Sequence, residues 1–162
     1  MNTTTITSIG ALILVVVVIV GVYILSIDQS NTKVTAVEAP LTVVDSSYNF
    51  GEIDIFGGKV RTTYTLVNEG VEDVTITSAA TSCMCTEGEI DGLVFGMHGQ
   101  NSKEVTIPAG SEQVLTAIFD PLAHGPEGTG PITRELFLET NSSITPEITV
   151  RFSGTVVKKI EN

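Results

Sequence analysis

A β-sandwich is predicted for residues 41–158, because apolar and polar residues alternate there with the period of two that strands require. Val, Ile, Thr and aromatic residues are frequent in these stretches, and clusters of Gly, Pro and Asn separate them. No helical period longer than two turns occurs in this part of the chain. The segment is long enough for one all-β domain that buries its own core.

A transmembrane helix is predicted before this domain. Residues 1–27 contain no charged side chain, and residues 9–27 are almost wholly apolar. About 20 apolar residues in a helix cross a bilayer core of about 30 Å. A cleaved signal peptide is the alternative, but its apolar region is usually about 7–15 residues, and Leu25, Ser26 and Ile27 make a poor cleavage site. We therefore expect residues 1–27 to be an uncleaved anchor that contacts membrane lipid through residues 9–27.

The remaining residues carry all of the charge. Residues 28–40 are polar and predict a flexible stalk, and residues 159–162 form a short tail. The chain has 8 basic and 19 acidic residues, for a net charge of −11. No cluster of Lys and Arg offsets this charge, so nucleic acid is not an expected partner. We expect a single-pass protein of the cell membrane whose acidic C-terminal domain is extracytoplasmic.

Seven segments are predicted to form strands, and their spacing indicates an antiparallel immunoglobulin-like sandwich. In the second of them, Val60, Tyr64 and Leu66 fall on one face. The chain has no Trp, so aliphatic and Phe side chains must fill the core. The seven segments are residues 41–44, 60–67, 74–77, 104–107, 114–119, 133–139 and 147–152.

Two connections between these strands are longer than ordinary turns. Residues 86–102 and 121–131 are rich in glycine, and loops of this length tend to be functional or disordered. Each of them contains one of the two histidines, His98 and His124. Residues 93–95 are apolar and are expected to pack back onto the sandwich.

Six short motifs occur in an order that resembles the bacterial domain-of-unknown-function 1573 family, over about residues 42–156. The resemblance implies an exported domain similar to the immunoglobulin-like ASH and major-sperm-protein modules, with a Cys-x-Cys motif, and it implies no reaction. Met84 stands where the family motif has glycine. The motifs lie at residues 50–53, 68–70, 81–86, 107–110, 119–121 and 139–141.

The two cysteines, Cys83 and Cys85, are separated by one residue. In an extended strand their Cα atoms would lie nearly 7 Å apart, whereas a disulfide prefers about 5.5–6 Å. A bond between them therefore requires a tight turn. Left as thiols, they can bind a soft ion such as copper or zinc. Three interpretations stay open, namely a metal site, a redox-active disulfide and a pair of inert thiols.

A metal would need ligands besides these two sulfurs. His98 and His124 are the candidates, and Met97 adds a thioether that suits copper. Loops that leave the strands of a sandwich can converge at one end, which would bring these side chains to the cysteines. The alternative is that both histidines hydrogen-bond to the backbone of their loops.

Sequence signatures of catalysis are missing, since there is no nucleophile elbow, no zinc-protease helix and no phosphate-binding loop. We therefore predict that the chain is not an enzyme. The first hypothesis is an extracytoplasmic binding or scaffolding module for an envelope or surface protein. The alternative is copper or zinc binding, or thiol redox chemistry, at Cys83 and Cys85 with His98 and His124.

Overall fold

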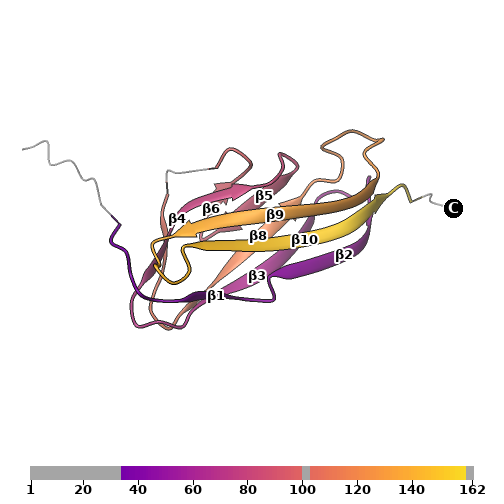
Figure 1. Cartoon of the computed structure of the whole chain (residues 1–162). Coiled ribbons are helices and arrows are strands. Elements are labelled where there is room, and N and C mark those ends of the chain that lie inside the picture. Colours follow the sequence, from indigo (N-terminus) through magenta and orange to yellow (C-terminus); the bar gives the residue numbers. More distant parts are fainter. Residues whose placement is uncertain (1–33, 100–102, 160–162) are drawn as a thin grey trace, which may run out of the picture. The chain divides into compact units, whose positions relative to one another are not determined.

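The computed structural model of the chain describes residues 34–99 and 103–159 (Figure 1). This part folds into ten strands and contains no helix that is long and apolar enough to cross a bilayer. The predicted anchor over residues 1–27 lies outside the described residues. The strands are β1 (Leu41–Val44), β2 (Ser47–Asp54), β3 (Val60–Asn68), β4 (Val74–Thr81), β5 (Thr86–Ile90), β6 (Leu93–Phe95), β7 (Val105–Ile107), β8 (Glu112–Phe119), β9 (Gly130–Thr140) and β10 (Glu147–Val157).

Two five-stranded sheets form the layers of the sandwich (Figure 1). One has the order β1-β3-β8-β5-β6 and the other the order β2-β10-β9-β4-β7. The all-β, two-sheet architecture predicted from the sequence is confirmed. The prediction that every pair is antiparallel is wrong at one edge, because β2 runs parallel to β10. The β10 strand is irregular there, at Gly154, where a Cβ atom would lie only 2.8 Å from Ile53 Cδ1.

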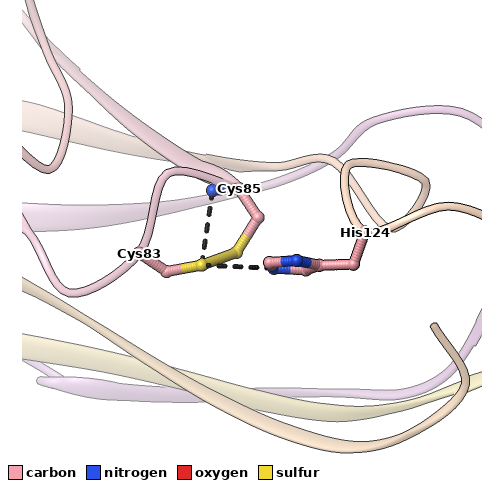
Figure 2. Close-up of side chains that lie close together, drawn as sticks. All are labelled: Cys83, Cys85 and His124. Carbon is pink, nitrogen blue, oxygen red and sulfur yellow. Dashed lines mark hydrogen bonds between the residues drawn. A yellow bond between two sulfur atoms is a disulfide. The ribbon is translucent and has the colours of Figure 1, made fainter.

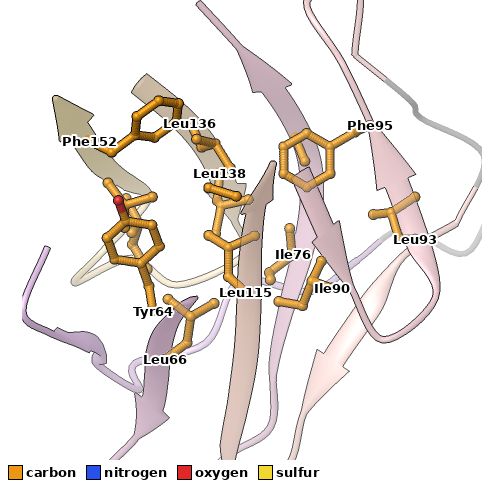
Figure 3. Close-up of a cluster of buried hydrophobic side chains, with 14 of the residues drawn as sticks. Tyr64, Leu66, Ile76, Ile90, Leu93, Phe95, Leu115, Leu136, Leu138 and Phe152 are labelled. Atoms are coloured by element: carbon orange, nitrogen blue, oxygen red, sulfur yellow. The ribbon is translucent and has the colours of Figure 1, made fainter. Parts of the chain in front are cut away.

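The core lies between the sheets and follows the predicted alternation (Figure 3). In β3, Tyr64 and Leu66 are buried, as expected from their shared face. The Tyr64 hydroxyl donates to the carbonyl oxygen of Arg151 at 2.8 Å, and burial raises the pKa of Tyr64 to about 12. Burying one large apolar side chain contributes about 1.5–3 kcal/mol to the free energy of unfolding, so the apolar core between the sheets supplies most of the stability. Other fully buried side chains include Leu115, Leu136, Leu138 and Phe152.

The segment expected to be a long loop over residues 86–102 is mostly a β-hairpin, and this prediction is wrong. Strands β5 and β6 pair with each other, and β5 also pairs with β8. Phe95 is 1% exposed and lies against Gly88, where a Cβ atom would meet its ring at 2.1 Å. The apolar residues 93–95 do pack onto the sandwich, as expected. Counting β2, β5 and β6 raises the predicted seven strands to ten.

Residues 34–40 differ from the flexible stalk that the sequence predicts over residues 28–40. Val37 forms a bridge with Ser142, and Ala39 is 0% exposed. A Cβ atom on Gly70 would lie 2.5 Å from Ala39 Cβ, so the chain passes directly over this glycine. The second half of the expected stalk is therefore packed against the domain, and residues 28–33 lie outside the described residues.

Candidate functional site

The cysteines lie in the turn that carries the chain from β4 in one sheet to β5 in the other. Ser82 binds the turn to β9, since its amide donates to the Glu135 carbonyl oxygen and its hydroxyl accepts from the Glu135 amide, both at 2.9 Å. The Thr81 hydroxyl lies 3.0 Å from the carbonyl oxygens of Cys83 and Thr86. These hydrogen bonds, made by the residues that flank the cysteines, therefore fix the conformation of the turn.

Cys83 and Cys85 form a disulfide in this turn, with their Cα atoms 5.3 Å apart (Figure 2). The spacing of nearly 7 Å that disfavoured such a bond applies to an extended strand, and the turn shortens it into the range of disulfides. The Thr86 amide donates to the Cys83 carbonyl oxygen at 3.1 Å and closes the turn. Met84 at its tip is 70% exposed and does not have a positive φ, so glycine is not needed there.

His124 approaches the disulfide from the loop that follows β8. Its Nε2 atom lies 3.6 Å from Cys83 Sγ (Figure 2). The Asp120 amide donates to the Cys85 carbonyl oxygen at 2.9 Å and ties the base of the loop to the cysteine turn. Gly128 lies against His124, where a Cβ atom would be 3.2 Å from His124 Cβ. Within the described residues, the donor atoms of Cys83, Cys85 and His124 all lie within 4.8 Å of one another.

His98 and Met97 do not belong to this group, although the sequence suggested them as ligands. Both lie in the exposed turn after β6, and Met97 is 40% exposed. The structure thus brings together three of the four residues predicted to hold a metal, and His98 is not among them.

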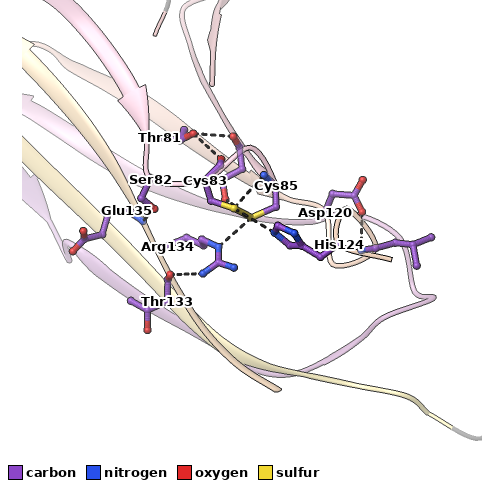
Figure 4. Close-up of a disulfide and its surroundings, with 11 residues drawn as sticks. Thr81, Ser82, Cys83, Cys85, Asp120, His124, Thr133, Arg134 and Glu135 are labelled. Atoms are coloured by element: carbon purple, nitrogen blue, oxygen red, sulfur yellow. Dashed lines mark hydrogen bonds between the residues drawn. A yellow bond between two sulfur atoms is a disulfide. The ribbon is translucent and has the colours of Figure 1, made fainter. Parts of the chain in front are cut away.

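Arg134 is a member of the site that the sequence analysis missed. Its Nε atom donates to Cys85 Sγ at 3.1 Å (Figure 4). Its guanidinium lies 5.8 Å from the centroid of the Phe119 ring. Burial lowers the pKa of Arg134 from its ordinary value, yet a guanidinium keeps its charge at neutral pH. A signal was present, because Arg134 has the same strand parity as Leu136 and Leu138 and so faces inward.

The two sulfurs differ in their surroundings. Cys85 is 3% exposed and contacts the cationic Arg134, whereas Cys83 is only partly buried and lies beside His124 on the solvent side. The neighbouring depression has a volume of about 100 Å³. Pockets for small-molecule substrates are usually about 300 Å³ or more, so this depression is too small for most such substrates. Its lining includes Lys59, Met84, Cys85 and Asp120.

The family model described as "Protein of unknown function (DUF1573)" matches residues 41–156 of the chain. The chain belongs to the DUF1573 family. The match runs from the start of β1 into β10 and includes the cysteine turn, so the resemblance read from the six motifs is confirmed. The comparison with curated proteins found no match.

Solved structures of similar fold include a protein of unknown function from Porphyromonas gingivalis W83. It is 15% identical with a TM-score of 0.58, and the match covers 78% of this chain and 51% of that one. The chain thus spans about half the length of this protein. An ASH/PapD-like domain of human CEP192 is 16% identical with a TM-score of 0.47, over 74% of this chain and 87% of that one. The DUF1573 domain of this chain is therefore a β-sandwich of two five-stranded sheets.

Proposed function

We propose that this DUF1573 protein exchanges its Cys83–Cys85 disulfide with thiols of other molecules on the outer side of a membrane. The observation that carries the proposal is the asymmetry of the two sulfurs. Cys83 is only partly buried and lies beside the exposed His124, whereas Cys85 is 3% exposed and receives a hydrogen bond of 3.1 Å from the Arg134 guanidinium. One sulfur is thus open to attack, and the other is placed to leave as a thiolate.

The exchange proceeds by displacement at sulfur. A thiolate from the partner attacks Cys83 Sγ, the bond to Cys85 breaks, and its electron pair remains on Cys85 as a thiolate next to Arg134. His124 Nε2, 3.6 Å from Cys83 Sγ, lies where it can accept the proton of the incoming thiol. A second partner thiol then attacks the mixed disulfide, so two thiols are oxidised to one disulfide and the protein gains two electrons and two protons. The exchange is stoichiometric and needs no repeated catalytic cycle, which agrees with the absence of catalytic sequence motifs.

The proposed setting supports this chemistry. Residues 9–27 are apolar enough to anchor the chain, and disulfides persist in compartments outside the cytoplasm. The bond closes a loop with a sequence separation of only 2, so its entropic contribution to stability is smaller than that of a long loop. A bond that contributes little to the fold can be opened without unfolding the domain.

The test is a redox titration of the full-length chain in detergent under native conditions. The protein is equilibrated with mixtures of oxidised and reduced dithiothreitol, free thiols are alkylated, and their number is counted by mass spectrometry. Two thiols should appear and disappear reversibly while the circular dichroism spectrum remains that of a β-sandwich. If the thiols become available only after denaturation, the disulfide is structural and the proposal fails.

A second proposed function is a contact with an envelope or surface protein at the same end of the sandwich. Two apolar side chains are exposed in the segments that form the site, namely Met84 between the cysteines, 70% exposed, and Leu122 in the loop that carries His124, 44% exposed. A photo-crosslinking residue at Met84 should capture a specific protein from cells. The control is the same residue at Val71, which is 92% exposed in the connection between β3 and β4. Equal capture from both positions would show that the cysteine end has no preferred partner.

A further inference from the structure

We propose that the reduced protein binds one Cu(I) ion through Cys83 Sγ, Cys85 Sγ and His124 Nε2. The inference depends on the proposed function only in that both need the two sulfurs to exist as free thiols. The observation behind it is that these three donor atoms, drawn from two separate loops, lie within 4.8 Å of one another.

The spacing of the donors fits a single ion. Atoms bound to one ion at about 2.0–2.3 Å lie about 3–4 Å apart, and His124 Nε2 is already 3.6 Å from Cys83 Sγ. Once the disulfide opens, the two sulfurs can separate to the same distance by rotation of their side chains. The hydrogen bond of 2.9 Å between the Asp120 amide and the Cys85 carbonyl oxygen keeps the two loops together in either state.

The chemistry of the donors selects the ion. Thiolates are soft ligands and favour Cu(I) or Zn(II) over Mg(II) and Ca(II), and in the described part of the chain no carboxylate belongs to the group. Structural zinc is almost always bound by four protein ligands. This group offers three, which leaves Cu(I) as the better match.

The charge around the site also favours a monovalent ion. Two thiolates and one Cu(I) carry a net charge of −1, and the Arg134 guanidinium beside Cys85 brings the cluster to zero. Neutrality matters because Cys85 is 3% exposed, and an uncompensated charge at a buried site is costly. With Zn(II) the same cluster would carry +1.

The disulfide and the bound ion exclude each other, since both use the same sulfur electrons. The oxidised protein therefore has no copper site, and copper bound to the reduced protein protects its thiols from exchange. The redox state of the compartment would in this way decide whether the domain holds the metal.

The experiment is a competition titration of the full-length chain, kept reduced and free of oxygen, in detergent. Cu(I) is shared with bathocuproine disulfonate, whose coloured complex reports the free metal. Reduced wild-type protein should withdraw one Cu(I) per chain, and oxidised protein should withdraw none. The His124→Asn variant should bind about tenfold or more weakly, and the His98→Asn variant should match the wild type. Circular dichroism checks that each variant is folded.

Several outcomes would overturn the inference. Reduced protein with two countable thiols that fails to withdraw Cu(I) has no copper site, and the thiol exchange proposed above would be unaffected. One ion per two chains would place the metal between molecules. An unchanged affinity in His124→Asn would remove the histidine from the ligand set. Conversely, if the native disulfide resists dithiothreitol but protein that is reduced in denaturant and refolded withdraws one Cu(I) per chain, the metal site is supported and the exchange function is contradicted.

Discussion

The two connections on either side of β4 make an instructive pair, because both carry the chain from one sheet to the other. In the first, between β3 and β4, the side chain of Asn68 is fully buried and bonds only to backbone atoms. In the second, between β4 and β5, the sulfurs of Cys83 and Cys85 contact the ionisable side chains of His124 and Arg134. Both lie within the residues that the DUF1573 family model matches, yet only the second leaves reactive atoms available. We propose that the first connection is structural and that the second carries the thiol exchange.

The largest expected effect is on stability, from Asn68→Ala. The Asn68 amide donates to the carbonyl oxygens of Glu72 and Ile107, each at 2.9 Å, and its Oδ1 atom accepts from the Gly70 amide at 3.0 Å. Removing it leaves buried backbone groups without partners, which should lower the free energy of unfolding by about 3 kcal/mol. Urea denaturation of the purified protein measures this.

The matched control for Asn68 is Val71→Ala in the same connection. Val71 is 92% exposed, so its substitution should change the free energy of unfolding by about 0.5 kcal/mol or less. Similar losses in the two variants would mean that the Asn68 hydrogen bonds do not hold this connection in place.

A smaller loss of stability is expected from Cys83→Ser. The disulfide closes a short loop, so its removal should lower the free energy of unfolding by about 1.5 kcal/mol, because the unfolded chain regains the conformational entropy that the cross-link removes. The same variant should lose all thiol exchange. A loss of stability as large as that of Asn68→Ala would indicate that the disulfide is a structural element, and the contrast between the two connections would disappear.

Arg134→Gln should act on reactivity more than on stability. Without the charged hydrogen bond to Cys85 Sγ, the departing thiolate is less stabilised, and reduction by 2-mercaptoethanol should slow about tenfold. Stopped-flow or timed alkylation measures the rate, and the uncharged reductant avoids steering by the acidic surface. Arg151→Gln is the control, because Arg151 bonds to Glu135 in the same sheet and does not contact the sulfurs. Equal slowing in both variants would point to a general effect of positive charge.

The sandwich could be predicted because its signal is local. Alternation in residues 60–67 directly gives the buried face of β3, with Tyr64 and Leu66 inward. Strands β5 and β6 were missed because Gly88 and Gly92 interrupt the pattern, and only the ring of Phe95 over Gly88 shows why glycine is tolerated there. The exposed β2 edge, with its parallel pairing to β10, likewise depends on a partner far away in the sequence.

The site was predictable only in part, for the same reason. Cys83 and Cys85 are recognisable from their spacing, but whether His98 or His124 approaches them depends on where the loops lie. The bond between the Asp120 amide and the Cys85 carbonyl oxygen, which brings His124 close, leaves no trace in the composition. Arg134 could have been found from its inward parity among Leu136 and Leu138, because an inward-facing charge calls for a partner.

The most direct test of the central claim locates the first product of thiol exchange. The oxidised full-length chain is exposed briefly to glutathione under native conditions, quenched with acid, digested and analysed by mass spectrometry. Our account predicts a glutathione adduct on Cys83 and a free thiol on Cys85. An adduct confined to Cys85, or no opening of the disulfide until the protein is unfolded, would contradict it.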